Sequence, residues 1–345
     1  MKRSHSNTGR GMVVLITALS SIAVIAIAAG YLMPWLAQRR DRSKPCNLLE
    51  CDTHTDLGEY AKTDPRLILF DEMPPLDPGI PNLRALAVGP EDRIYIAGEN
   101  TVVLLTPDWK RISGPDKTLS GSVHCLTAHD RDFFIGTQNH VEVMKDHSLG
   151  LIAWETLGKN AYITSIAVTD NDVFVADAGN RIILRYDHDG KLLNRIGAKD
   201  TKRGIPGFIL PSAYFDVAAG PDGSVWAANT GRHSLENYRP NGDLISSWGD
   251  ASPDIAGFCG CCNPSHFAIL PDGRFVTAEK GFARVKIYDP AGKFLGVVAG
   301  PEKFARGTVG LDIAVDSTRR ILVLDPKRGK IRVFVEKQPN AGEKP

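Results

Sequence analysis

A cluster of three cysteines and one histidine is the most chemically suggestive stretch of the sequence. Cys259, Cys261 and Cys262 fall within four positions, and His266 follows shortly after them. Thiolate and imidazole are good ligands for zinc and copper, and the outer two cysteines have C-x-x-C spacing. Asn263 stands where a c-type haem site requires histidine, which excludes that site. The stretch predicts a zinc, copper or redox site, or else a loop locked by a disulfide.

The disulfide interpretation has more than one form. Cys261 and Cys262 could form a vicinal bridge, or one loop cysteine could pair with Cys125. Cys46 and Cys51 lie close together nearer the N-terminus and could pair with each other. In an exported protein, an even number of cysteines favours disulfides.

A unit that repeats six times after residue 80 must position these residues. Each copy contains about four short apolar strands separated by turns rich in Gly, Asn and Asp, which tolerate the backbone angles of tight turns. A small residue of the first strand recurs at steps of 40, 40, 51, 50 and 46, at Ala87, Thr127, Ala167, Ala218, Ala268 and Ala314. Such a period is typical of a propeller, in which six blades bury each other's faces around an axis. A β-sandwich also has many short strands, but six in-phase copies favour an all-β, six-bladed β-propeller over residues 81–336.

The repeats resemble a known family. The segment SIAVTDNDVFVADAGNRIILRYDHDGKLLNRIG, which starts at Ser165, is similar to the NHL repeat in its apolar strand, its polar turn, its Asn-Arg pair and its closing hairpin. The segments that start at Asp216 and Phe267 are similar as well, whereas the first two copies are degenerate. The resemblance covers roughly residues 80 to 335. It implies a six-bladed propeller but no single activity, because such propellers include enzymes, RNA binders and protein-binding scaffolds.

Alignment of the six copies places one set of side chains around the central channel. Two positions before the recurring small residue lie Ala85, Cys125, Ser165, Asp216, His266 and Asp312. Equivalent positions of the innermost strands face a shared axis, and converging ligand-type side chains would suit a metal or a small molecule. The alternative is that polar residues simply face channel water. The candidate metal ligands are therefore Cys259, Cys261, Cys262, His266, Cys125, Asp216 and Asp312, with zinc or copper as the metals that suit them.

Two further sets of polar residues receive structural interpretations. The residues that recur after the second strand are expected to accept hydrogen bonds from backbone amides, and these are Asp177, Asn229, Glu279 and Asp325. The scattered histidines are expected on the surface or in loops, and these are His124, His129, His140, His147 and His233.

The first 80 residues differ from the repeats. After a short basic N-terminus (1–10), residues 11–37 contain no charge and exceed the length of about 20 residues that spans a bilayer. We expect a transmembrane anchor there, or a signal peptide cleaved near Ala26-Ile27-Ala28; both export the propeller. Residues 38–80 form a linker in which the segment Pro65 to Glu72 could be a strand that closes the ring against the last blade. Residues 337–345 are expected to be a disordered tail.

The overall charge argues against nucleic acid as a partner. Lys and Arg total 41 against 40 for Asp and Glu, so there is no global basic signal. The expected function is that of a single-pass membrane protein whose propeller lies outside the cytoplasm, in the periplasm or the extracellular space. There it would act as a binding or scaffold module for a protein or a small ligand. The alternative is a metal-dependent enzyme or redox protein that uses the channel and the cysteine loop.

Overall fold

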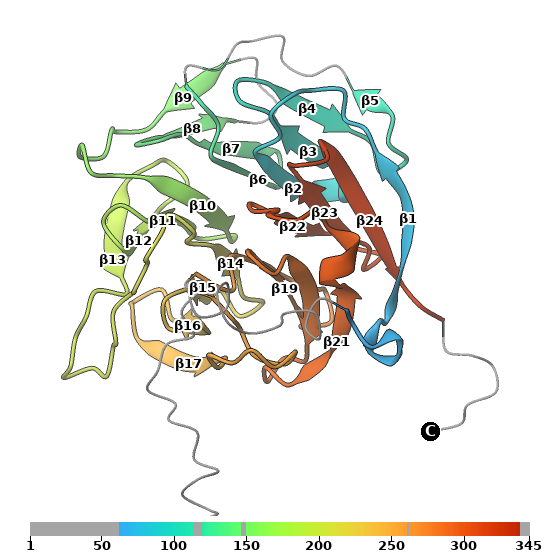
Figure 1. The fold of residues 1–345 in the computed structure, drawn as a ribbon. Helices are drawn as coiled ribbons and strands as arrows, with labels where there is room; N and C mark the ends of the chain where they lie inside the picture. The colour runs from blue at the N-terminus through green and yellow to red at the C-terminus, as the bar shows by residue number, and fades with distance from the viewer. Residues whose placement is uncertain (1–61, 113–118, 120, 146–149, 261, 339–345) are drawn as a thin grey trace, which may run out of the picture. The chain divides into compact units, whose positions relative to one another are not determined.

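Six antiparallel four-stranded sheets surround a central channel (Figure 1). The structure, a computed structural model, describes residues 62–112, 119, 121–145, 150–260 and 262–338. The innermost strand of each sheet contacts the innermost strands of the two neighbouring sheets. The innermost strand of the last sheet also contacts that of the first, so the ring is closed. The six-bladed β-propeller that the repeats predict is therefore the fold of this part of the chain.

Five blades are built from four consecutive strands, with the innermost strand first. The first two blades comprise β2 (Ala85–Val88), β3 (Ile94–Ala97), β4 (Val102–Leu105) and β5 (Arg111–Ile112), then β6 (Cys125–His129), β7 (Asp132–Gly136), β8 (Val141–Met144) and β9 (Leu151–Ala153). The next two comprise β10 (Ile163–Val168), β11 (Val173–Asp177), β12 (Ile182–Tyr186) and β13 (Leu192–Ile196), then β14 (Val217–Ala219), β15 (Val225–Asn229), β16 (Ser234–Tyr238) and β17 (Leu244–Trp248). The fifth comprises β18 (His266–Ile269), β19 (Phe275–Glu279), β20 (Arg284–Tyr288) and β21 (Phe294–Ala299).

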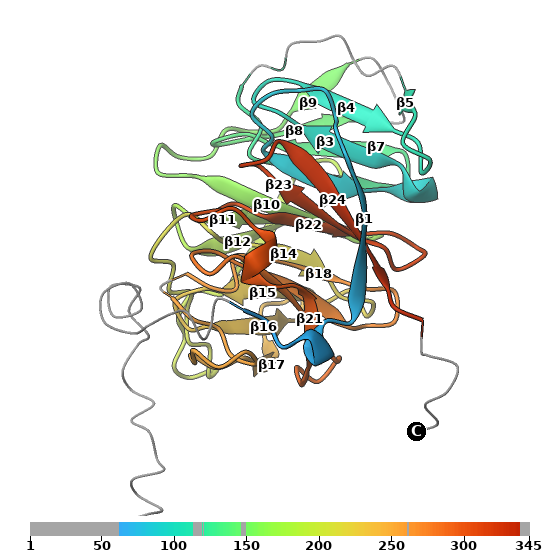
Figure 2. The same cartoon turned by 45° about the vertical axis from the view of Figure 1, so that its right-hand side comes forward.

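The sixth blade joins the two ends of the propeller. Its inner strands come from the C-terminal part of the chain, as β22 (Asp312–Val315), β23 (Ile321–Asp325) and β24 (Lys330–Glu336). Its outermost strand is β1 (Phe70–Leu76), which precedes the first blade in the sequence. Figure 2 shows β1 running along β24. This pairing covers the edge that β24 would otherwise expose.

The closing strand lies further along the chain than the segment Pro65 to Glu72. Pro65–Leu67 instead forms a short 3-10 helix (η1), capped by the side chain of Asp64, which accepts a hydrogen bond from the backbone of Arg66. The strand runs on through two prolines, and its register with β24 shifts between Met73 and Leu76, where they lie. Proline lacks a backbone donor, so it is tolerated in a strand at the edge of a sheet. Two more 3-10 helices, η2 (Pro90–Asp92) and η3 (Pro301–Lys303), lie in connections.

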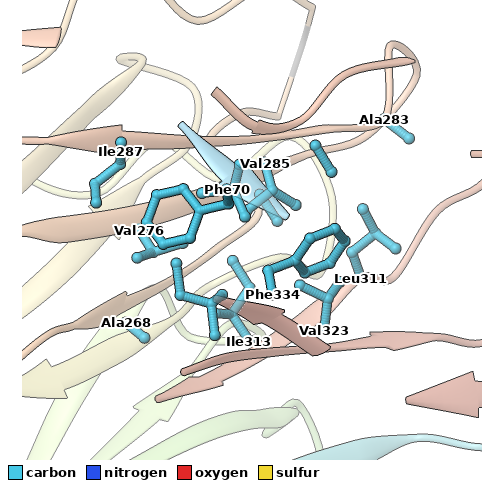
Figure 3. Close-up of a cluster of buried hydrophobic side chains, with 14 of the residues drawn as sticks. Phe70, Ala268, Val276, Ala283, Val285, Ile287, Leu311, Ile313, Val323 and Phe334 are labelled. Atoms are coloured by element: carbon cyan, nitrogen blue, oxygen red, sulfur yellow. The ribbon is translucent and has the colours of Figure 1, made fainter. Parts of the chain in front are cut away.

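The hydrophobic core is divided into six clusters, each filling the space between two neighbouring blades. Figure 3 shows the cluster between the fifth and sixth blades, where Val276 and Val285 face Ile313 and Phe334. Phe70 of the closing strand is 3% exposed and belongs to the same cluster. Because strand residues alternate between faces, each central strand supplies apolar side chains to both of its neighbours.

The polar residues after the second strands accept backbone hydrogen bonds, as the repeat pattern predicts, and these are Asp177, Asn229, Glu279 and Asp325. Asp177 is the clearest case, because its Oδ1 accepts hydrogen bonds from the backbone N–H groups of Tyr162 at 3.0 Å and Asn180 at 3.1 Å. Tyr162 precedes β10, so the carboxylate ties the loop that enters the blade to the hairpin that turns it.

Several sequence predictions fall outside the described residues. They are the anchor or signal peptide at 11–37, the basic N-terminus, the linker up to residue 61, the pair Cys46 and Cys51, and all but the first two residues of the tail. Within the described ranges, no helix is long and apolar enough to cross a membrane.

Candidate functional site in the central channel

The structure brings five of the six ring residues together. A cavity of about 260 Å³ in the channel is lined by Cys125, Ser165, Asp216, His266 and Asp312. All five lie at or near the start of an innermost strand, which explains how residues so distant in sequence meet. The sixth, Ala85, is buried in the contact between the first and second blades.

Three of these side chains join one blade to the next. Each of these three side chains accepts a hydrogen bond from a backbone N–H of the next blade, at the residue directly after the ring position. The three contacts are Asp216 Oδ2 with Phe267 N at 2.8 Å, Asp312 Oδ2 with Leu86 N at 2.8 Å, and Ser165 Oγ with Val217 N at 3.3 Å. The other oxygen of each carboxylate accepts a bond from the backbone of its own strand. The two aspartates are thus interblade contacts, a role that their residue type alone did not reveal.

Burial controls the electrostatics of the channel. Burial raises the pKa of Asp312 to about 6, against the opposing effect of His266, and it raises the pKa of Asp216 as well. Burial, together with the charges of Asp312 and Asp216, raises the pKa of the Cys125 thiol well above its usual range. Cys125 also packs in the core between the second and third blades. Its thiol is therefore held in the protonated form at neutral pH and contributes to the packing between these blades.

The cysteine loop lies apart from this cavity. Cys259 and Cys262 belong to the connection that precedes β18, and neither lines the channel cavity. The Ser212 hydroxyl donates a hydrogen bond to Cys262 Sγ at 2.8 Å. No disulfide joins Cys125, Cys259 and Cys262 to one another, so the predicted bridge between Cys125 and either of these loop cysteines is not present. Cys261 lies outside the described residues.

Hydrogen bonds from two blades hold the cysteine loop in place. The Asn263 side chain exchanges bonds with the backbone of Lys280, at 2.9 Å and 3.1 Å. His233 Nε2 contacts the carbonyl oxygen of Gly260. His233 lies in the turn between β15 and β16, which agrees with the predicted surface or loop position, but it is only 4% exposed and its imidazole supports the cysteine loop from within.

The arrangement does not support the predicted zinc or copper site. Among the residues that the structure describes, no three His, Cys, Asp or Glu side chains are grouped so that they could hold a metal ion. The carboxylates of Asp216 and Asp312 are occupied by backbone amides, and the described loop cysteines do not reach the channel cavity.

A second, larger cavity forms the mouth of the channel, at the end where the innermost strands begin. It measures about 420 Å³ and shares Arg84, His124, Thr164 and His266 with the channel cavity. Its walls include two tyrosines that precede innermost strands, Tyr162 and Tyr214. We call this cavity the channel mouth.

The channel mouth contains residues that the sequence analysis did not assign to a site. His124 lies in the loop before β6, as expected for the scattered histidines, and it is half-buried and lines both cavities. Arg84, His124 and Thr164 each stand one position before a ring residue. Extending the alignment of the copies by that single position would have indicated them, because they share the end of the strand that faces the mouth.

Comparisons with known proteins agree with the fold. No protein-family model matches the sequence, and no curated protein matches it. Among solved structures, a protein of unknown function from Bacteroides thetaiotaomicron is similar with a TM-score of 0.55 and 13% identity, over 74% of this chain and 70% of that chain. The WD40 propeller domain of Doa1 is similar with a TM-score of 0.52 and 15% identity, over 74% and 79%. A catalytically inactive virginiamycin B lyase from Staphylococcus aureus, solved with quinupristin, has a TM-score of 0.50 and 12% identity, over 74% and 80%. At these identities the similarity shows the β-propeller fold alone.

Proposed function

We propose that this chain is an NHL-type propeller that acts as a binding module, with the channel mouth as its binding site. An N-terminal membrane anchor would hold the propeller outside the cytoplasm, where it would bind a small ligand or a segment of a protein. The observation that carries the proposal is the channel mouth itself. Its volume of about 420 Å³ lies in the range of small-molecule sites, and aromatic and polar side chains converge on it.

The surface around the channel mouth supports the same proposal. Three large apolar side chains are exposed in loops that precede innermost strands, namely Tyr162 (38%), Ile209 (46%) and Val309 (49%). Each loop enters a different blade on the face that carries the mouth. Tyr162 lines the mouth itself, and exposed apolar side chains on the loops of a rigid scaffold commonly take part in binding.

The metal-dependent or redox alternative has less support. It draws on both the ring and the cysteine loop, and the structure places the described members of these two sets in different surroundings. The similarity to a lyase is one of fold and supplies no residues to this chain. We therefore favour binding as the function of the channel mouth.

A small-molecule screen tests the binding function. We expect that compounds which raise the melting temperature of the full-length protein will bind about tenfold more weakly to Tyr214→Ala, because the variant removes one aromatic wall of the mouth. Leu193→Ala is the matched control, since Leu193 is an exposed apolar side chain on the outermost strand β13. Compounds that bind Tyr214→Ala as well as the wild type would place the binding site elsewhere.

A reporter fusion tests the location of the propeller. The uncharged run at 11–37 leads us to expect that a reporter active only after export will be active when it is fused after Pro345. Activity of a cytoplasm-only reporter at the same position would contradict the proposed location.

A further inference from the structure

The junction between the channel cavity and the channel mouth is rich in nitrogen groups that lack a partner. Arg84 lines both cavities and forms no ion pair with any carboxylate of the described residues. His266 also lines both cavities, and its Nδ1 is buried without a hydrogen-bond partner in the described part of the chain. Arg84 is exposed, so its guanidinium is accessible to an incoming group, whereas the buried Nδ1 of His266 is unfavourable unless a polar group from outside the protein reaches it.

The charge of the channel mouth has one sign. Of the residues that line the two cavities, only Asp216 and Asp312 are acidic, and neither lines the mouth. Backbone amides already occupy both oxygens of each carboxylate. Arg84 lies at the mouth. Burial lowers the pKa of His124, and the charge of Arg84 lowers it further. A negative group entering the mouth would therefore meet positive charge before it meets either carboxylate.

Further groups near the mouth agree with this sign. Lys280 Nζ lies 4.7 Å from the centre of the Tyr214 ring and 3.3 Å from the hydroxyl of Ser212. Two carboxylates contact residues of the mouth: exposed Glu99 accepts a long hydrogen bond of 3.4 Å from Asn82, and buried Asp177 is engaged by the backbone of Tyr162 at 3.0 Å.

Two tyrosine rings form walls of the mouth, and each contacts a histidine ring. The Tyr162 ring lies 4.6 Å from the His124 ring, and the Tyr214 ring meets the His266 ring edge-on at 5.8 Å and 88°. The two tyrosines enter from the third and fourth blades, so they face the mouth from adjacent sides of the ring. Tyrosine presents a large, fairly rigid apolar surface, which suits a planar partner.

We infer, building on the proposed binding function, that the channel mouth takes a small organic anion with a planar aromatic body. The anionic oxygens contact Arg84 and His266, and the body lies against Tyr162 and Tyr214. Arginine recognises carboxylate and phosphate groups through two parallel hydrogen bonds, so the two head groups share this chemistry.

Four matched probes test the inference on the full-length protein: benzoate, phenyl phosphate, benzamide and benzylamine. We expect at least one of the two anions to bind about tenfold or more tightly than neutral benzamide, as a charge-assisted pair implies, and benzylamine to bind most weakly. The tighter of the two anions identifies the head group. Arg84→Gln should remove the preference for the anion, whereas Arg84→Lys should retain part of it, since lysine keeps the charge and loses the fork. Arg195→Gln is the control, because Arg195 is an exposed arginine on the outermost strand β13.

Each other outcome has a distinct meaning. Equal binding of benzamide, tighter binding of benzylamine, or anion binding that survives Arg84→Gln would overturn the anion inference and leave the channel mouth as a binding site. Failure of all four probes would also overturn it. The proposed function would stand in that case if other compounds still bind in a way that depends on Tyr214. If no compound does, the proposed function fails as well.

Discussion

A chain that begins at Asp77, after the closing strand β1, is expected to lose most of its stability relative to a chain that begins at Thr63. The shorter chain lacks Phe70, which is 3% exposed in the core between the fifth and sixth blades. It also exposes the edge of β24 and removes Glu72, whose carboxylate accepts a 2.7 Å hydrogen bond from the buried guanidinium of Arg332. Loss of a buried Phe side chain and of a largely buried charge partner amounts to at least about 5 kcal/mol, which is comparable with the whole stability of a typical domain. Thermal unfolding and size-exclusion chromatography of the two chains measure the difference.

Point variants of the longer chain separate the contributions to this loss. Glu72→Ala should cost about 2 kcal/mol, because Arg332 is 1% exposed and would retain the Lys303 carbonyl at 3.0 Å but, among the described carboxylates, only the more distant Asp325 at 3.8 Å. Asp71→Ala is the matched control, since Asp71 is the neighbouring carboxylate on the same strand and is exposed. Equal melting temperatures for the chains that begin at Asp77 and Thr63 would show that β1 does not hold the ring closed.

The architecture could be predicted because its evidence is repeated and local. Each of the first five blades is formed by consecutive residues within a repeat of about 40 to 50, so the period, the turn residues and the ring positions are visible in the sequence. The position of β1 was harder to predict, because Pro74 and Pro75 indicate a linker. Only the pairing with β24 shows that they lie on an edge strand, where proline is tolerated.

The roles of the ring residues could not be predicted from their types. An aspartate that faces a channel looks the same in sequence whether it binds a metal or a neighbouring blade. The partner of Asp216 is 51 residues away in the next blade, so that contact exists only once the two blades have packed together; the partner of Asp312 is 226 residues away, so that contact exists only once the ring has closed. The cysteine loop is a similar case: its spacing resembles that of a metal site, yet the fold directs Cys262 toward Ser212.

Glu279→Gln is expected to destabilise the propeller by at least about 4 kcal/mol. Glu279 is 1% exposed, and it pairs with Arg284 and with the fully buried Lys286, each at 2.7 Å. The neutral amide would leave two cations buried with no carboxylate in contact with them among the described residues. Glu279 also accepts a hydrogen bond from the backbone N–H of Cys259 at 3.3 Å, so the start of the cysteine loop should loosen in the same variant. Chemical denaturation measures the stability, and hydrogen exchange of residues 256–260 measures the order of the loop.

The stability of the wild type and of Glu279→Gln at low pH provides an independent test of the ion cluster. Burial opposes ionisation of Glu279, but the charges of Lys286 and Arg284 outweigh it and hold its pKa below the ordinary value of 4.5. A carboxyl group whose pKa is lower in the folded state stabilises the protein above its unfolded pKa, and this stabilisation is lost as the pH falls through the folded pKa. The margin by which the wild type exceeds Glu279→Gln should therefore be present at about pH 5 and should shrink as the pH falls below about 4.5.

Glu236→Gln is the matched control, because the fourth blade has a buried glutamate on its third strand, β16, whereas Glu279 lies on the second strand of the fifth blade, β19. Glu236 occupies in β16 the position that Lys286 occupies in β20, and it is equally enclosed, at 2% exposure. It accepts hydrogen bonds from Tyr238 and Asn229, with no ion pair among the described residues, and burial raises its pKa. A neutral amide should be tolerated there at a cost of about 1 kcal/mol, since no buried cation loses its partner. If the two variants were destabilised equally, the loss would come from replacing a hydrogen-bond acceptor by an amide donor rather than from charge, and the buried ion cluster would not be what stabilises the fifth blade.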